Sequence, residues 1–554
     1  MKRELEVALA GCVKDLFDVD VAVELTRPDE QFGDYATNVA LQLAKQIGKP
    51  PREIAEALAG LVKEKLAGQV NEVSVAGPGF LNLCLSDEAL VESLDAKPSR
   101  SLEGKTAVAE YSDPNPFKVL HAGHLYTSIV GDAIANLLEQ AGATVHRVNF
   151  GGDVGMHVAK NMWAILRFLG DENPEKLDEV SKDERANWLS ERYVEGNRAY
   201  EEDPAAKTEI TEINKRIYGL HDSDEHDSDF ARIYWTCRQW SYDYFDEFYA
   251  RIGTKFEKYY PESQTAPVGL KIVREHIGDV YQESDGAIIF PGENHDLHTR
   301  VFINSEGLPT YEAKDVGLIM KKWQDYKFDL SVVITGNDII EYMKVVLKSI
   351  EQFQPELSER TRHLTHGMVK MAGGVKMSSR LGNILRATDV LDSAHEANLA
   401  LTNKENPEVE LGAVKYAFLK SRIGGDTIYD PTESVSLEGN SGPYLQYAHA
   451  RARSILSKAG SEGAGINDLE PGERTLVRKM SEYPESVDKA VAELMPHHVC
   501  TYLYELAQTF NRFYENNRVV GDDRQETRLA LVSRYANTLR DGLSLLGIAS
   551  PDKM

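Results

Sequence analysis

Two histidines separated by an alanine and a glycine are the residues of this chain best suited to chemistry. His121 and His124 close the stretch Tyr111-Ser-Asp-Pro-Asn-Pro-Phe-Lys-Val-Leu-His-Ala-Gly-His124, where a short strand runs through proline-punctuated turns into a helix. A helix that opens in this way presents neutral imidazoles and free backbone N–H groups to a polyphosphate. Lys376, in Gly374-Val-Lys-Met-Ser-Ser-Arg-Leu-Gly-Asn383, supplies the cation that such a site needs. Together the two segments favour an enzyme that activates a carboxylate with ATP.

The elements around the histidines predict a nucleotide-binding type of α/β fold. Thr106 to Tyr111 is typical of a buried strand, Leu125 to Ala141 of a helix that Gly142 ends, and Thr144 to Phe150 of the next strand. A right-handed crossover of this kind places ligands at the carboxyl ends of the strands. The sequence therefore predicts a Rossmann-like, doubly wound parallel sheet with the histidines at its binding edge.

The chain of 554 residues is too long for one core, and its pattern predicts three domains. Residues 1–97 form a small α+β domain, and residues 104–425 form the α/β domain with a helical insertion at about 160–265. Residues 430–554 form an all-α helix bundle. The α/β pattern is expected to resume after the insertion in further strand-like segments, at 287–290, 302, 310–311 and 330–336.

Composition narrows the class of protein further. The net charge of −26 opposes a generic nucleic-acid binder, although local basic patches and shape still suffice for folded RNA. No apolar stretch is long enough to span a bilayer, and acids follow Met1-Lys-Arg where a signal peptide needs apolar residues, so a cytoplasmic protein without a membrane partner is expected.

Cysteines and acidic runs give weaker signals. The four cysteines lie far apart without a Cys-x-x-Cys pair, which favours buried thiols over disulfides or zinc ligands. They are Cys12, Cys84, Cys237 and Cys500. The run from His221 to Asp229 reads as a charged exposed insertion, and a metal site built from His221, His226 and the neighbouring acids is the alternative.

The motifs resemble those of class I aminoacyl-tRNA synthetases, specifically the arginyl-tRNA synthetase family. Residues 114–124 with Gly131-Asp132 are similar to that family's form of the class I signature, and 441–451 resemble the start of its anticodon-binding helix domain. Residues 528–554 resemble the end of that domain. The segments 32–38 and 77–80 are similar to the family's extra N-terminal domain. The likeness runs nearly end to end, with the motifs in the family's order.

The resemblance implies that ATP, with its Mg²⁺, activates L-arginine to arginyl-adenylate and pyrophosphate, after which arginine passes to the 3' end of tRNA(Arg). Such catalysis is mainly positioning and electrostatic stabilisation. His121 and His124 are expected to donate to the phosphoryl oxygens, and Lys376 to neutralise the leaving pyrophosphate. The ATP-binding residues implied are Gly123, Gly367, Met368, Val369, Ser378 and Ser379.

One lysine of the family's usual loop is missing here. Ser379 stands where the second lysine is expected, and Arg380 follows it. Arginyl enzymes with such a loop often carry a lysine just before the first signature histidine, and Lys118 holds that place. The resemblance therefore implies Lys118 as a catalytic cation. Arg380 is the alternative, although a guanidinium fork does not replace an ammonium.

Acidic residues should select the substrate, because planar carboxylates match the donors of a guanidinium with paired, charge-assisted bonds. By resemblance, Glu110 and Asn115 lie near the amino-acid head, whereas Tyr311 and Asp315, one helical turn apart, meet the guanidinium. Asp338 stands where the family commonly has an amide or imidazole. It either adds a third acid near the substrate or exchanges a structural contact.

Contacts to tRNA are implied at both ends of the chain. Single-stranded bases are read by stacking and by hydrogen bonds to their edges. The positions that resemble anticodon contacts are Tyr447, Arg451, Tyr514 and Met554, and those that resemble contacts to the tRNA elbow are Phe80 and Asn82. Tyr514 could equally pack in the core. The family also generally requires bound tRNA before it consumes ATP.

Two other readings compete with this one. A class I enzyme for cysteine has a similar C-terminal domain, but it uses a cysteine-rich zinc site that this sequence lacks. A non-catalytic paralogue that binds tRNA or an amino acid has no need of a pyrophosphate clamp, so the set of His121, His124, Lys118 and Lys376 opposes it. A monomer without zinc is expected from the family resemblance.

Overall fold

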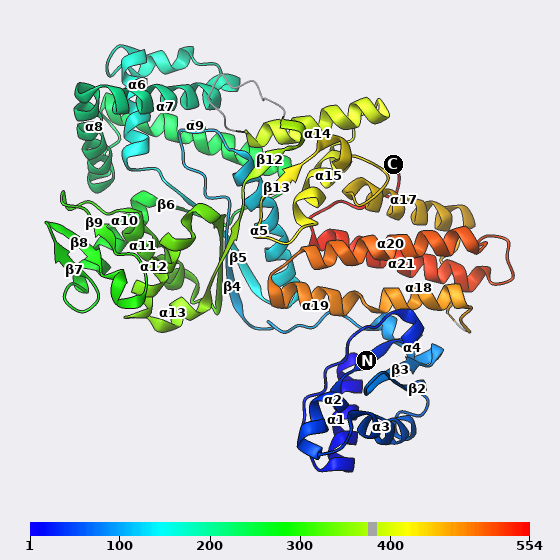
Figure 1. Ribbon diagram of the computed structural model, residues 1–554. Helices are drawn as coiled ribbons and strands as arrows, with labels where there is room; N and C mark the ends of the chain where they lie inside the picture. The colour runs from blue at the N-terminus through cyan, green and yellow to red at the C-terminus, as the bar shows by residue number, and fades with distance from the viewer. Residues whose placement is uncertain (375–384, 467) are drawn as a thin grey trace.

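A five-stranded parallel sheet lies at the centre of the structure, a computed structural model that describes residues 1–374, 385–466 and 468–554 (Figure 1). Its strands are β4 (Thr106–Glu110), β5 (Thr144–Gly151), β6 (Lys258–Pro261), β10 (Leu330–Gly336) and β11 (Thr361–His366). The spatial order is β11-β10-β4-β5-β6, so the order reverses at β4. Ligands bind such sheets outside the carboxyl ends of the strands at this reversal. The doubly wound fold predicted from the sequence is confirmed.

Helix α5 (Ala122–Gln140) follows β4 and covers one face of the sheet. Its apolar residues recur on a broad face, and Leu125, Ile129, Ile134 and Leu138 are all buried. The helix is packed so closely that a Cβ at Gly131 would lie 2.2 Å from the ring of Tyr111. The start of α5 is therefore fixed at the edge of the sheet where the ligand is expected.

A four-helix segment separates β5 from β6 (Figure 1). It consists of α6 (Met156–Leu169), α7 (Arg185–Glu202), α8 (Pro204–Ser223) and α9 (Asp229–Ile252). Its own apolar core includes Met162, Ile165, Ile210 and Ile217. Residues 258–261 form a strand of the central sheet, so the helical insertion expected at about 160–265 ends earlier, at Ile252.

The region after β6 differs from the sequence expectation. Following α10 (Glu262–Glu275), the strands β7 (Gln282–Ser284), β8 (Ala287–Phe290) and β9 (Arg300–Ile303) form a separate antiparallel sheet. Residues 287–290 and 302 were expected to continue the main fold, and 310–311 to be strand-like, but α11 (Tyr311–Tyr326) begins there. Short apolar runs do not reveal which sheet they join, which explains the error.

The rest of this half follows from β10 and β11, the two strands on one side of β4. α12 (Ile340–Glu351) and α13 (Pro355–Arg360) connect them, and the short strands β12 (Val369–Met371) and β13 (Thr427–Tyr429) pair in parallel beyond them. The remaining helices are α14 (Ala387–Thr402), α15 (Pro407–Leu419) and α16 (Pro431–Ser434).

The first 92 residues form a small α+β unit beside the C-terminal helices (Figure 1). It contains α1 (Lys2–Phe17), α2 (Val39–Ile47), α3 (Pro51–Lys65) and α4 (Asp87–Glu92), with an antiparallel sheet of β1 (Tyr35–Thr37), β3 (Phe80–Leu85) and β2 (Val70–Ala76). Buried Asp34 accepts a hydrogen bond from Arg474 of the helical region at 2.7 Å, and Arg27 pairs with Glu485 at 2.7 Å. Charged contacts thus join this unit to the bundle.

The C-terminal region is a helix bundle, as predicted. Its helices are α17 (Gly442–Ala459), α18 (Pro471–Ser481), α19 (Tyr483–Glu493), α20 (His497–Asn516) and α21 (Gln525–Leu545). The bundle packs against α5 of the central domain, where Lys415 donates to the carbonyl of Gly547 at 2.7 Å. Among the helices of the described residues, none has both the length and the apolar composition needed to cross a membrane.

All four cysteines are free thiols; three are buried and Cys84 is half-buried. In the acidic run, His221 hydrogen-bonds the Tyr234 hydroxyl at 2.7 Å, and the ring of His226 stacks on Trp235. Over residues 1–374, 385–466 and 468–554, no group of three or more His, Cys, Asp or Glu side chains is arranged to hold a metal ion. The run therefore behaves as a surface segment whose histidines have protein partners.

Candidate active site

The loop that connects β4 to α5 carries the candidate catalytic residues in a strained backbone. Ser112, Asp113 and Phe117 have φ values of 74°, 51° and 68°, a region that residues other than glycine rarely occupy. Such strain persists only where surrounding structure over-determines it. Asp113 Oδ1 accepts the N–H of Phe150 at 2.8 Å, which ties the loop to β5.

The helical segment holds the same loop from the other side. Phe117 donates its N–H to Ser241 Oγ and accepts a hydrogen bond from Asn161 Nδ2, both at 2.8 Å. The N–H of Val119 donates to Ser190 Oγ at 2.8 Å. Because α6, α7 and α9 each supply one of these side chains, the segment fixes the loop that leads to the histidines.

His121 and His124 form a reciprocal cap at the start of α5. Nδ1 of His121 accepts the N–H groups of Gly123 and His124 at 3.1 and 3.4 Å, and Nδ1 of His124 accepts the N–H of His121 at 3.1 Å. Since each Nδ1 is an acceptor, each neutral ring carries its proton on Nε2. Capping and catalysis are therefore compatible, because the cap leaves both Nε2–H groups free to donate.

Both imidazoles are held neutral. The pKa of His121 is lowered to about 4, chiefly by burial and also by His366 and Lys118, although the residue keeps an exposed surface. Burial followed by the charges of His121 and Lys118 lowers the pKa of His124 well below its ordinary value. The rings stack with centroids 3.7 Å apart. Two neutral donors thus lie side by side at the mouth of the helix.

Gly123 is needed for this stacked arrangement. A Cβ at this position would lie 2.9 Å from Cε1 and Nδ1 of the His121 ring. Any side chain would push that ring away and break the cap. The nearest neighbour of Gly123 in the structure is therefore the His121 imidazole.

Lys118 lies beside the histidines and is largely shielded from water. Its Nζ sits 3.9 Å from the centre of the Tyr193 ring, which projects from α7. Burial lowers the pKa of Lys118 to about 8. Its positive charge acts on His121 and His124, whose pKa values it lowers, so the three groups face a common space.

Asn115 is oriented by a chain of hydrogen bonds that the sequence did not reveal. Its Oδ1 accepts the N–H of Gly152 at 2.9 Å, and the carbonyl of Gly152 accepts a hydrogen bond from His157 Nε2 at 2.6 Å. Burial lowers the pKa of His157 to about 3, so it is neutral. With its oxygen occupied, Asn115 presents its amide N–H groups. The glycines of 151–155 were the available signal, because a Cβ at Gly152 would lie 2.6 Å from Asn115 Oδ1.

Glu110, expected near the amino-acid head, has a protein partner. It is the last residue of β4, is 3 % exposed, and forms a buried ion pair with Lys322 of α11, which also contacts Ser331 Oγ at 3.3 Å. A buried carboxylate needs such a cation. Lys322 was missed from the sequence, since it lies 212 residues further along the chain.

Asp315 and Tyr311 both lie on α11, one helical turn apart. Asp315 accepts a hydrogen bond from the Tyr342 hydroxyl, and Tyr311 is exposed. The pKa of Asp315 is raised to about 7, chiefly by burial and also by Glu110, against the lowering effect of that hydrogen bond. The pKa of Asp113 is also raised, by burial and then by Glu110. Asp113 was not singled out from the sequence.

Asp338 follows β10 and lies toward the imidazoles. Its Oδ1 would be 2.5 Å from a Cβ at Gly336, so the side chain folds back over that glycine. Its negative charge raises the pKa values of His121 and His366, in opposition to the larger effect of burial. This influence on the histidines is neither of the two roles that the sequence left open.

The segment expected to hold adenine is bonded to a neighbouring strand. Gly367 donates its N–H to the carbonyl of Gly425 at 3.1 Å, and Met368 donates its own to Asp426 Oδ1 at 2.8 Å. The carbonyl of Met368 accepts the N–H of Thr427 at 2.9 Å, and Val369 begins β12. The backbone groups are therefore occupied, whereas the Met368 side chain is 62 % exposed. Lys376, Ser378, Ser379 and Arg380 lie outside the described residues.

The residues expected to contact the anticodon lie on one part of the bundle. The Arg451 guanidinium of α17 sits 4.6 Å from the ring centre of Tyr514 on α20, and Tyr447, one turn before Arg451, is 44 % exposed. Met554 is also exposed. The C-terminal segment before Met554 contacts α17, where His449 Nδ1 lies 3.0 Å from the carbonyl oxygen of Pro551.

The two residues of the N-terminal unit that were expected to contact the tRNA elbow differ in their exposure. Phe80, the first residue of β3, is 42 % exposed. Asn82, two residues further on the same strand, is only 5 % exposed, so its side chain offers little surface to a tRNA.

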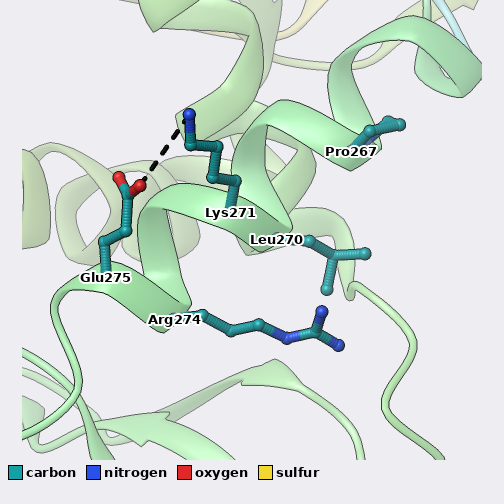
Figure 2. Close-up of a pocket in the computed structure, with 5 residues that line it drawn as sticks. All are labelled: Pro267, Leu270, Lys271, Arg274 and Glu275. Atoms are coloured by element: carbon teal, nitrogen blue, oxygen red, sulfur yellow. Dashed lines mark ion pairs between the residues drawn. The ribbon is translucent and has the colours of Figure 1, made fainter.

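A pocket of about 490 Å³ lies away from these residues, on the outer face of α10 (Figure 2). Its lining consists of Pro267, Leu270, Lys271, Arg274 and Glu275, and Lys271 pairs with Glu275 at 3.8 Å. None of these side chains belongs to the site predicted from the sequence.

The doubly wound sheet and the paired histidines at its switch point define a class I aminoacyl-tRNA synthetase. Residues 87–429 match the family model "tRNA synthetases class I (R), catalytic domain". Residues 1–85 match "Arginyl tRNA synthetase N terminal domain", and residues 445–554 match "DALR anticodon binding domain". The chain belongs to the arginyl-tRNA synthetase family, as its motifs suggested.

Full-length relatives agree with this assignment. The chain is 27% identical to an arginine–tRNA ligase of Phocaeicola vulgatus, with all of both chains covered, and 29% identical to one of Porphyromonas gingivalis, with 100% and 99% covered. The solved structure of Thermus thermophilus arginyl-tRNA synthetase matches with a TM-score of 0.81 and 26% identity over 100% of both chains. That of Plasmodium falciparum matches in fold, with a TM-score of 0.80 and 20% identity over 100% and 99%. The non-catalytic alternative gains no support.

Proposed function

We propose that this chain activates L-arginine with ATP, releases pyrophosphate, and transfers arginine to the 3' end of tRNA(Arg) with the residues described above. The observation that carries the proposal is the pair of neutral, stacked imidazoles beside the Lys118 ammonium. All three are preorganised at the switch point of the sheet. Electrostatic groups that are fixed before reaction stabilise developing charge without a cost of reorganisation.

In the first step, the arginine carboxylate attacks the α-phosphorus of ATP, which enters with its Mg²⁺ bound to the phosphates. The Nε2–H groups of His121 and His124 donate to phosphoryl oxygens as negative charge builds on them. Lys118 supplies the positive charge that the second lysine of the usual loop would give, and Lys376 meets the leaving pyrophosphate. No side chain needs to act as a nucleophile.

A cluster of buried carboxyl groups supports arginine as the substrate. Glu110, Asp113 and Asp315 influence one another, whereas Lys322 is the cation that pairs with this group. Nearby Glu262 is already paired with Lys314 at 2.5 Å. The three carboxyl groups share one ammonium, and burial raises the pKa of both Asp113 and Asp315. A guanidinium would supply the positive charge that their ionised forms need, with Tyr311 at the open side of the site and the Asn115 amide near the amino-acid head.

For tRNA, we propose that residues 430–554 bind the anticodon through Tyr447, Arg451, Tyr514 and Met554, and that residues 1–97 meet the elbow through Phe80. Exposed aromatic rings support stacking with unpaired bases. Residues 104–425 would hold the catalytic site. A cytoplasmic monomer remains the expectation from the family resemblance.

Charging unfractionated tRNA with each of the twenty amino acids, using the purified chain, ATP and Mg²⁺, tests the proposal. Attachment of arginine alone is the expected result. Attachment of another amino acid would contradict the assignment of Asp315 and Tyr311. Tight binding of tRNA without any charging would instead indicate a non-catalytic paralogue.

A further inference from the structure

Lys118 is held in an unusual way for a catalytic cation. Its Nζ lies 3.9 Å from the centre of the Tyr193 ring. Within the described part of the chain, no carboxylate forms an ion pair with it. A carboxylate would fix the ammonium but would also cancel its charge. An aromatic face attracts a cation through its quadrupole and leaves the charge available to a phosphate.

Helix α7 is built to present this ring to the loop. Ser190, three residues before Tyr193 and therefore on the same face, accepts the N–H of Val119 at 2.8 Å. One face of α7 thus contacts the backbone of one loop residue and the side chain of its neighbour. Both contacts come from the helical segment between β5 and β6.

The position of α7 is itself fixed. A Cβ at Gly196, one turn after Tyr193, would lie 1.8 Å from the carbonyl oxygen of Lys160 on α6, so the two helices meet backbone to backbone. Asn161 of α6 also donates to the carbonyl of Leu189 at 2.9 Å. The ring of Tyr193 therefore has a defined place relative to the catalytic loop.

We propose that Tyr193 is a positioning residue, whose ring holds the Lys118 ammonium beside His121 and His124 without neutralising it. The inference rests on the proposed catalytic role of Lys118. The ring face offsets the loss of hydration that the ammonium suffers on burial. Without the ring, the lysine side chain would leave the site or release its proton. The helical segment would then contribute to catalysis directly, in addition to supporting the loop.

A double-mutant cycle tests the proposal. Tyr193→Leu and Lys118→Met are made singly and together in the full-length chain, and kcat for arginine activation is measured by pyrophosphate exchange with tRNA present. Tyr193→Leu should lower kcat about fivefold to tenfold, with KM for arginine nearly unchanged. Tyr193→Phe keeps the ring face and should stay within about twofold of the parent. In the Lys118→Met background, Tyr193→Leu should have no further effect.

Tyr200→Leu is the matched control, because Tyr200 lies on the same helix and its ring centre also lies 4.2 Å from a lysine ammonium, that of Lys160, which is paired with Glu201 at 3.7 Å. It should leave kcat unchanged. An equal loss from Tyr193→Leu in both backgrounds would overturn the proposal, since the ring would then act through packing. An impaired Lys118→Met with a normal Tyr193→Leu would overturn this inference alone. A normal Lys118→Met would refute the role of Lys118 and this inference with it.

Discussion

The loop before α5 and the exposed face of α17 hold their polar and aromatic residues in opposite ways. At the loop, His121, His124 and Lys118 have pKa values lowered by burial, and hydrogen bonds from three helices fix the backbone. On α17, Tyr447 is open to solvent, and Arg451 rests on the ring of Tyr514. Activation chemistry requires polar groups that are fixed before the reaction. Unpaired bases, in contrast, stack on aromatic side chains that are exposed to solvent.

Changes in the two regions should therefore affect different kinetic constants. A change at the loop removes stabilisation that exists only in the transition state, so it lowers kcat. A change on α17 removes uniform binding of tRNA, so it raises KM for tRNA alone.

The largest effect is expected at the loop. His124→Ala removes one Nε2–H donor and the acceptor that caps the N–H of His121. We expect kcat for arginine activation to fall about 100- to 1,000-fold, as for the loss of one preorganised donor elsewhere. Pyrophosphate exchange with tRNA present measures it. His146→Ala is the control, because His146 pairs with Glu257 at the surface, and an equal loss there would show that the assay reports general damage.

The arginine pocket should respond next. Asp315→Asn removes a carboxylate that a buried guanidinium would need, and we expect KM for arginine to rise about 30-fold or more. KM for ATP should hardly change. Titration of the exchange rate with each substrate measures both constants, and an equal rise in the two would contradict a pocket specific to arginine.

A smaller effect should follow from pH. Because burial raises the pKa of Asp315 to about 7, the carboxyl is mostly ionised at pH 8 and mostly protonated at pH 6. The guanidinium pairs with the ionised form, so the affinity for arginine should fall about tenfold when the pH is lowered from 8 to 6. Equilibrium binding of labelled arginine measures it. Asp315→Asn should remove most of the dependence, and an unchanged profile would show that another group titrates.

The smallest effect is expected on α17. Tyr447→Ala should raise KM for tRNA about fivefold to tenfold, the cost of one lost base-stacking contact. The rate of arginine activation at saturating tRNA should not change. Tyr504→Ala is an informative comparison, because that ring packs against Tyr444 inside the bundle and should lower thermal stability. A loss of activation in Tyr447→Ala would contradict the separation of the two regions.

Sequence patterns predicted the long elements and the chemical motifs. The C-terminal bundle was predicted over residues 430–554, because amphipathic patterns sustained over several turns, such as that of His497–Asn516, are a strong signal. The histidine pair was recognisable because its spacing is local. By contrast, strands of four residues such as β6 and β8 carry no local information about the sheet that they join.

The partners of the site residues were beyond the reach of the sequence. The fold brings Lys322 to Glu110 and Tyr193 to Lys118, and both of these pairs join distant segments. It also brings His157 to the carbonyl of Gly152. Each partner looks like an ordinary lysine, histidine or tyrosine in its own helix. Charge balance and burial, which depend on the assembled core, are what make these residues functional candidates.

Charging by Lys118→Met and Tyr447→Ala at increasing tRNA concentration tests the central claim most directly. We expect saturating tRNA to restore Tyr447→Ala to within about twofold of the parent, while Lys118→Met stays at least about 100-fold slower at every concentration. Recovery of Lys118→Met by tRNA, or a defect of Tyr447→Ala that persists at saturation, would contradict it.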